Sequence, residues 1–453
     1  MNHIQQVDLE IPLGKRSRKY RFFEILPAVL SIGAIVLLLL LSFFAPTLAA
    51  LYVLIIILIT FVRAIGVAFR TVQGNVVRHK FAKLSWENLL FAIEHPADLP
   101  NEITGKGANI TFAGQEVSKF IAGEKLQNQQ LPHRLDPKNV IVTTFDCDNR
   151  PSLQFFVALT YEFVVRENRQ QIALQPLCLF NNNIWDVPAP VRVIATGNTF
   201  FNIIGAMRRY TLRNFACHSQ GLWALEQMNF WSRHTVVEDG HQFWRSYFYF
   251  NGNYEVVPFH ASVGQDAVWA GSYRRSLRAQ FIQLRRWAYG VSDVPYVASI
   301  GFSNAFKGSK VDIFAKFYRL LEGHISLACV APIAAFGAFA PLYLNPLAAR
   351  TSIVVNDLPL IVSRIQLVAT IGLLITVFFS LLLLPPRPKN YRRSRNILMV
   401  IQWALMPITA ICYWSAAAYT AQIRLAMAHY MGKFDVTEKK LVKHPEVRIS
   451  TKR

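Results

Sequence analysis

Long apolar runs near both ends of the chain constrain its fold more than any other feature. The first run, Ile25–Phe44, contains no charged residue and has about the length that a helix needs to cross a bilayer. It is too long for the core of a signal peptide. Pro46 and Thr47 turn the chain, and a second run, Leu48–Phe69, leads it back. The sequence therefore predicts an integral membrane protein whose residues 1–72 hold a basic N-terminus and a two-helix transmembrane hairpin.

Three more apolar runs follow a long polar interval. Ile325–Leu344 and Ile361–Leu384 predict two further membrane helices. The fifth run, Ile397–Tyr419, is interrupted by Pro407, so it fits either a spanning course or a re-entrant or interfacial one. The predicted C-terminal parts are two or three membrane helices at 323–421 and a basic cytoplasmic tail at 422–453.

The basic residues set the expected orientation. The chain has 48 Lys and Arg against 27 Asp and Glu, a formal net charge of +21. Basic segments flank the first hairpin on both sides and follow the fourth run, which places these flanks in the cytoplasm. Since the cations gather at membrane flanks and in the central domain, the expected partner is the lipid bilayer and not nucleic acid. The expected location is the plasma (inner) membrane, with the central domain cytoplasmic.

Residues 309–322 predict an interfacial amphipathic helix. Val311, Phe314 and Phe317 recur at helical spacing, with Lys310 and Lys316 beside them. An apolar stripe with basic edges is typical of a helix that lies on an anionic lipid surface. We therefore expect Phe314 and Phe317 to point toward lipid.

An acidic pair follows the clearest strand pattern of the central domain. Asn139–Phe145 is rich in β-branched residues, which predicts a strand. Asp146 and Asp148 come directly after it, at the end of a strand where α/β sheets bind ligands. Their oxygens suit a hard divalent cation that bridges two phosphates. An ordinary Asx turn is the alternative interpretation of an isolated D-x-D pattern.

Two weaker patterns lie on either side of this pair. Upstream, "GKGANITFA" places Lys106 between two glycines, which fits either a phosphate contact or a plain surface turn. Downstream, residues 276–290 carry an apolar stripe at helical spacing, and Gln283, Arg286 and Trp287 share an adjoining face. An amide, a guanidinium and an indole suit a diphosphate and a sugar ring, although a basic interfacial helix fits the same spacing.

A Glu-Asp pair, Glu238 and Asp239, precedes a run of aromatic residues. Acids are favoured at a helix N-terminus, where the unpaired N–H groups and the helix dipole attract negative charge. Whether capping is their only role depends on what else the chain carries.

Taken in order, G-K-G-x-N, D-x-D, E-D and Q-x-x-R-W between membrane helices resemble the membrane-embedded family 2 glycosyltransferases, which include cellulose and hyaluronan synthases. The resemblance covers roughly residues 100–435. It implies an α/β GT-A-like cytoplasmic domain at 73–308, combined with α-helical transmembrane segments. It also implies a nucleotide-diphosphate sugar as donor and a polysaccharide or lipid as acceptor, with inversion at the transferred sugar.

The resemblance assigns a role to each motif. Asp146 and Asp148 would hold Mg²⁺ or Mn²⁺ on the donor, and Lys106 and Asn109 would lie near its nucleotide. Asp239 would be the catalytic base.

The remaining motif residues would line the acceptor and pyrophosphate side of the site. They are Glu238, Gln283, Arg286 and Trp287.

The family's domain begins with strands that this chain lacks. Residues 70–104 contain no apolar strand run, so on the order of 60–80 residues of a nucleotide-binding fold are expected to be absent. The predicted domain is therefore partial at its start. The alternative function is a catalytically inactive homologue that serves as a membrane scaffold. A transporter is disfavoured, because the apolar runs lack the paired charges of a substrate pathway.

Overall fold

The structure is a computed structural model that describes residues 8–74, 91–97, 99–389 and 391–440 of the 453-residue chain. Within these residues, five helical segments are long and apolar enough to cross a membrane, which supports the predicted membrane protein. They are α1 (Arg18–Phe44), Pro46–Gly66 of α2 (Pro46–Gly74), Lys310–Leu344, α13 (Ile353–Leu382) and Arg395–Ala426.

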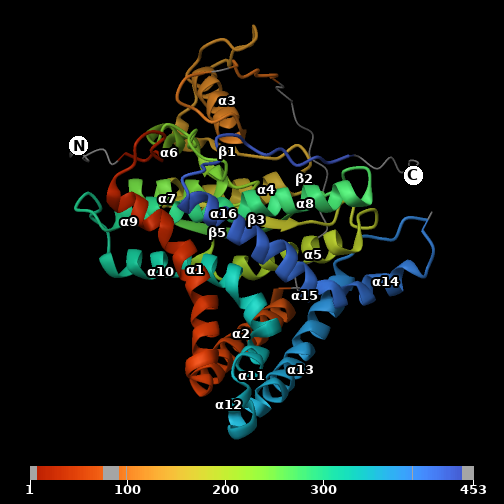
Figure 1. The fold of residues 1–453 in the computed structure, drawn as a ribbon. Coiled ribbons are helices and arrows are strands. Elements are labelled where there is room, and N and C mark those ends of the chain that lie inside the picture. The colour runs from red at the N-terminus through yellow and green to blue at the C-terminus, as the bar shows by residue number, and fades with distance from the viewer. Residues whose placement is uncertain (1–7, 75–90, 98, 390, 441–453) are drawn as a thin grey trace.

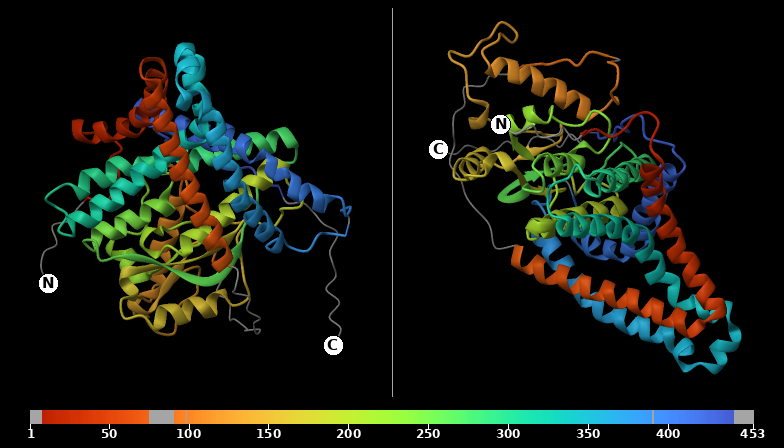
Figure 2. Two further views of the ribbon diagram at one scale, coloured as in Figure 1. Left: turned by 90° about the horizontal axis from the view of Figure 1, so that it is seen from below. Right: turned by 90° about the vertical axis from the view of Figure 1, so that its left-hand side faces the viewer.

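α1, α2 and α13 form a bundle that projects from the rest of the molecule (Figure 1). Its tip is made by the short helices α11 (Ala340–Leu344) and α12 (Pro346–Thr351). α2 and α13 run side by side along the bundle (Figure 2). Ser17 caps α1 by accepting a hydrogen bond from the backbone of Tyr20, and Pro46 opens α2 at a position where its missing N–H costs little.

The fifth segment is not a uniform helix. It consists of α14 (Arg395–Ile401), a 3₁₀ turn, α15 (Met406–Thr409), a π-helical turn and α16 (Ala416–Ala426). α16 packs against both α1 and α8 (Tyr273–Ala288) of the central domain. The segment thus lies against the domain over part of its length.

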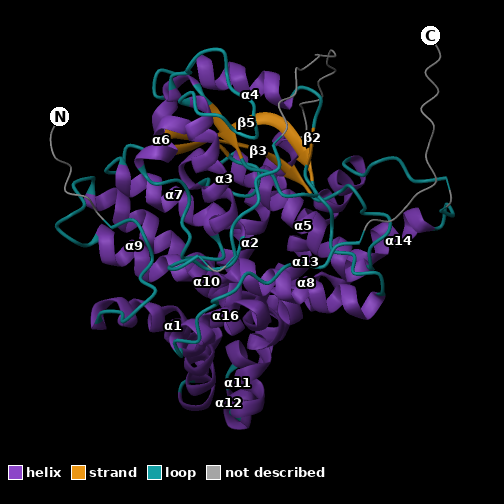
Figure 3. Ribbon diagram, turned by 90° about the horizontal axis from the view of Figure 1, so that it is seen from above, coloured by secondary structure: helices purple, strands orange, loops and turns teal. Residues whose placement is uncertain are grey.

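The central domain contains a mixed five-stranded sheet in the order β1-β4-β3-β5-β2 (Figure 3). The strands are β1 (Ile141–Thr143), β2 (Arg150–Pro151), β3 (Ile172–Leu179), β4 (Ser219–Gly221) and β5 (Glu255–Gly264). β3 and β5 are parallel, with a register shift between Gln175 and Leu177 where Pro176 interrupts the ladder. The other pairs are antiparallel.

β1 lies at one edge of this sheet. A partial α/β domain was predicted, and the observed mixed sheet with flanking helices agrees with it at that coarse level. Most of the segment in which the family's first strands would be expected, residues 75–90, lies outside the described residues. The GT-A topology itself stays a prediction.

Helices cover both faces of the sheet. α4 (Phe155–Val164) packs on β5, and α5 (Ala189–Ala206) packs on β3. α7 (Glu238–Tyr249) and α9 (Asp293–Gly301) join the sheet to the membrane bundle. One hydrophobic core contains Trp244 of α7, Tyr296 of α9 and Val53 of α2. The domain and the membrane helices are therefore packed as one unit.

The predicted interfacial helix at 309–322 is the first half of a longer element. α10 runs from Lys310 to Phe336 without a break and is capped by Ser309. Phe314 is 62% exposed, as expected for a lipid-facing residue. Phe317 is 7% exposed and packs on Phe23 and Phe302, with ring centroids 5.8 and 5.0 Å away. The prediction that Phe317 faces lipid is wrong, because α1 covers this face of α10.

Candidate functional site

Lys106 is the centre of the candidate site. It is the first residue of α3 (Lys106–Ile121), and Gly105 precedes it in extended conformation. Its Nζ lies 2.9 Å from Asp146 Oδ1, 3.0 Å from Asp239 Oδ2 and 3.5 Å from Glu238 Oε1. Three motifs that are far apart in the sequence therefore meet at one ammonium group.

The glycines beside Lys106 allow two close contacts of the backbone. A Cβ on Gly107 would lie 2.4 Å from the carbonyl oxygen of Ser232, and one on Gly105 would lie 2.9 Å from Cβ of Phe434. Both positions need glycine because no side chain atom fits there. The motif is a packed helix start and not the plain surface turn considered above.

The D-x-D carboxylates come after β1, as predicted, but they bind different partners. Asp146 contacts Lys106, and its backbone N–H donates to Asn149 Oδ1 at 3.1 Å. Asp148 Oδ2 accepts from the backbone N–H of Asp266 at 3.0 Å and from Lys439 Nζ at 2.5 Å. Each carboxylate is thus neutralised by a lysine, and a local turn is present as well.

Glu238 and Asp239 occupy the first turn of α7, where the helix dipole favours acids. The capping interpretation is therefore correct in position, but the same side chains also face Lys106. The side chain of Asp239 is 22% exposed, whereas that of Glu238 is 3% exposed. Only Asp239 is accessible to a bound molecule.

The two adjacent carboxyl groups have opposite pKa shifts. Burial would raise the pKa of Asp239, but the charge of Lys106 outweighs it and holds this pKa below its ordinary value. Burial and the neighbouring Asp239 raise the pKa of Glu238 to about 7, although Lys106 opposes the shift. Asp239 is the ionised member of the pair at neutral pH.

His218 lies beside Asp239, with 3.6 Å between Nδ1 and Oδ1. Trp231 Nε1 donates to Nε2 of the imidazole at 3.1 Å, so Nδ1 carries the proton and donates to the Phe215 carbonyl at 2.9 Å. Burial lowers the pKa of His218. Both nitrogens of the neutral ring are in use, which makes His218 a fixed neighbour of Asp239 and not a proton acceptor.

The Q-x-x-R-W residues lie on α8 and separate into different environments. Arg286 is close enough to Glu238, Asp146 and Asp239 for all three to oppose the lowering of its pKa by burial. Gln283 is buried and accepts a hydrogen bond from Gln280 at 3.1 Å. Of these residues, Arg286 belongs to the carboxylate cluster.

Two other predicted site residues have surroundings of their own. Trp287 packs against Phe180 and Trp414, with ring centroids 5.9 and 6.4 Å away. Asn109 is exposed, one turn after Lys106 on α3. Neither residue is part of the cluster of interacting charges, which consists of Lys106, Asp146, Glu238, Asp239 and Arg286.

The segment that follows α16 also contributes to the candidate site, which the sequence patterns did not predict. Lys433 forms a β-bridge with Thr104, and the Phe434 ring lies 4.1 Å from the Arg286 guanidinium. Asp435 pairs with Arg285 at 2.7 Å, and Lys439 pairs with Asp148. Residues 433–440 thus cross the candidate site, whereas we expected only a basic tail. The available signal was "FDVTEKK", in which apolar and acidic residues interrupt the basic tail.

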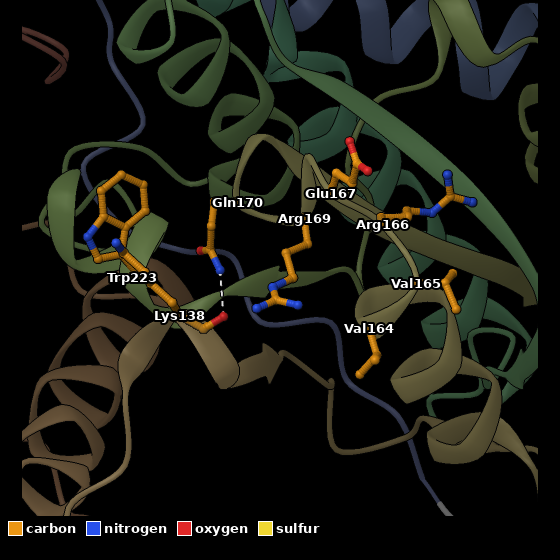
Figure 4. A pocket seen from close by; sticks show the side chains of 8 residues that line it. All are labelled: Lys138, Val164, Val165, Arg166, Glu167, Arg169, Gln170 and Trp223. Atoms are coloured by element: carbon orange, nitrogen blue, oxygen red, sulfur yellow. Dashed lines mark hydrogen bonds between the residues drawn. The ribbon is translucent and has the colours of Figure 1, made fainter.

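A separate hollow of about 520 Å³ lies away from this cluster. Its lining residues come from the segment before β1, the end of α4 and the turns that follow it, and the start of α6 (Leu222–Gln227). They include Lys138, Arg169 and Trp223 (Figure 4). Asp146 follows the opposite end of β1, and none of the motif residues lines the hollow. The hollow is not the candidate site.

No known protein family matches the chain, and no curated protein matches it with significant similarity.

Proposed function

We propose that the chain is a membrane glycosyltransferase of the family 2 type. It transfers a hexosyl group from a nucleotide-diphosphate sugar to a polysaccharide or lipid acceptor, with inversion. The observation that supports this proposal is the convergence of Asp146, Glu238 and Asp239 on Lys106, with Arg286 beside them. A carboxylate and cations in one cluster provide both a base and a counter-charge for a leaving diphosphate.

Asp239 acts as the base in this mechanism, because it is ionised and partly exposed. It takes the proton of the acceptor hydroxyl while the hydroxyl oxygen forms a bond to C1 of the donor sugar. The bond from C1 to the diphosphate oxygen breaks, and its electron pair stays on the diphosphate. Arg286 compensates the charge that develops there.

Asp146 and Asp148 are the residues that would hold Mg²⁺ or Mn²⁺. They offer hard oxygen donors on one loop, and the Asp146 side chain is 38% exposed. The described residues contain no cluster of three or more His, Cys, Asp or Glu suited to a metal, so donor phosphates and water would complete the coordination. Such an ion would supply electrostatic stabilisation of the leaving diphosphate.

The direct test uses the full chain in lipid nanodiscs with a panel of UDP- and GDP-sugars and Mg²⁺ or Mn²⁺. We expect release of nucleoside diphosphate by the wild type. Asp239→Asn should lower turnover by about 10²–10⁴-fold, the typical contribution of a general base, while nucleotide affinity stays unchanged. Glu124→Gln, at an exposed position on the chain, should behave as the wild type. Absence of both binding and release with every donor contradicts the proposal.

A non-catalytic scaffold is the second candidate, favoured by the segment 433–440. Lys439 neutralises Asp148, and Phe434 covers Arg286, so part of the candidate site is filled by the chain itself. In the same assay, a scaffold would neither bind nor hydrolyse nor transfer from any nucleotide sugar.

A further inference from the structure

Residues that precede α1 dock into the central domain beside the candidate site. Glu10 Oε2 accepts a hydrogen bond from Ser232 Oγ at 2.6 Å, and Glu10 Oε1 accepts from Arg245 Nη2 at 2.8 Å. Ile11 is buried, and its carbonyl oxygen lies 2.8 Å from His234 Nδ1. Specific hydrogen bonds and a buried side chain therefore hold this segment on the central domain.

Arg245 is the buried half of this contact. It is 1% exposed, and it donates to the carbonyl groups of Met228, Phe230 and Leu9 as well as to Glu10. Glu10 is the only acidic partner that the described residues give it. A buried guanidinium without an anionic partner is costly, so Glu10 and Arg245 hold each other in place.

Both partners of Glu10 connect to the cluster around Lys106. The Ser232 carbonyl packs on Gly107, in the first turn of α3, next to Lys106. Arg245 lies on α7, which begins with Glu238 and Asp239. One carboxylate from the N-terminal segment thus binds α7 directly and also binds Ser232, the loop residue whose carbonyl packs against the first turn of α3.

We propose that Glu10 is a positioning residue, which sets the distance between the first turns of α3 and α7 and so brings Lys106 to Asp239. Its effect on transfer rests on the proposed function, whereas its effect on Lys106 does not. Through Glu10, the chain segment that enters the first membrane helix fixes the geometry of a site in the central domain.

The first arm of the test needs no substrate. The full chain in nanodiscs is treated with acetic anhydride, and acetylation of Lys106 is measured by mass spectrometry relative to Lys119, an exposed lysine on the same helix. Glu10→Ala should raise this ratio by about tenfold, because a hydrogen bond between charged groups is lost. Glu10→Gln keeps an accepting oxygen and should give a smaller rise. Lys15→Ala, an exposed change in the same segment, should give none.

The second arm measures transfer. Glu10→Ala should lower kcat and leave the KM for the donor unchanged, and Glu10→Gln should restore most of kcat. A residue that merely supported the fold would lower the amount of active protein without this rescue. The proposal is overturned if the acetylation of Lys106 relative to Lys119 is unchanged in both Glu10→Gln and Glu10→Ala. If Glu10→Ala does not fold, the acetylation ratio of Glu10→Gln alone decides. If the wild type transfers no sugar, the proposed function fails while the acetylation result still decides the role of Glu10.

Discussion

Glu238 and Asp239 are neighbours in the chain, yet the fold gives them different chemistry. Lys106 contacts both, at 3.5 and 3.0 Å, but Glu238 is almost fully buried and lies against the charge of Asp239. Its carboxyl therefore keeps a proton up to a pKa of about 7, while Asp239 is ionised well below neutrality. The sequence shows an E-D pair, but only the packing around it separates a carboxyl group that keeps its proton up to about pH 7 from one that is ionised.

This difference predicts a pH-dependent effect of Glu238→Gln on stability. Between the ordinary pKa of 4.5 and the folded value of about 7, folded Glu238 holds a proton that the unfolded chain has released. Wild-type stability therefore falls as pH rises through this window. Gln does not ionise. The free energy of unfolding of the variant should therefore rise relative to that of the wild type by up to about 3 kcal/mol between pH 4.5 and 8.

The measurement is the unfolding midpoint of both proteins in nanodiscs across this pH range. Parallel curves for wild type and Glu238→Gln would contradict the assigned pKa. Asp239→Asn is the matched control with the opposite sign. The lowered pKa of Asp239 contributes stability above its unfolded value of 3.8, and this contribution is lost as pH falls through the folded pKa. Asp239→Asn should therefore lower the free energy of unfolding at neutral pH and have no such effect in acid.

At the scale of elements, the start of α3 depends on a glycine that has no space beside it. Gly107→Ala places a Cβ 2.4 Å from the Ser232 carbonyl oxygen, so α3 or the backbone at Ser232 has to move. We expect a loss of about 1–3 kcal/mol from overpacking, measured by thermal unfolding. Gly197→Ala is the control, because this helical glycine of α5 has nothing within 4 Å of the added Cβ. It should stabilise the protein by roughly 0.5–1 kcal/mol. Equal effects of the two changes would contradict the packing described here.

Local patterns predicted several elements but not their partners. The strand expected at Asn139–Phe145 is the shorter β1, Ile141–Thr143, and the helix expected at 276–290 is α8, Tyr273–Ala288. Side-chain alternation and helical spacing are properties of a few neighbouring residues, and therefore the sequence carries them. The contact of Lys106 with Asp146 and Asp239 joins positions far apart in the chain, and motif order alone does not give such distances.

At the scale of the whole molecule, the sequence predicted membrane helices from length and composition, but it did not predict how the domain rests on them. The helical stripe of Phe314 and Phe317 is apolar whether lipid or protein covers it. Only the fold shows that α1 passes over one side of α10, so that Phe23 contacts Phe317. The role of segment 433–440 was missed for the same reason, since its partners lie in α8, in the loop before α3 and in the loop after β1.

The joint between the domain and the membrane bundle can be tested at Phe317. Its ring packs on Phe23 of α1 and Phe302 after α9, inside the core that the two parts share. Phe317→Ala removes this ring and should cost about 3–5 kcal/mol, measured as a lower unfolding midpoint in nanodiscs. Phe314→Ala, one helical turn away on the exposed side of α10, should cost much less, because few protein contacts are lost. If Phe314→Ala is the more damaging change, then lipid and not α1 covers the face that carries Phe317, and the domain is attached to the bundle in another way.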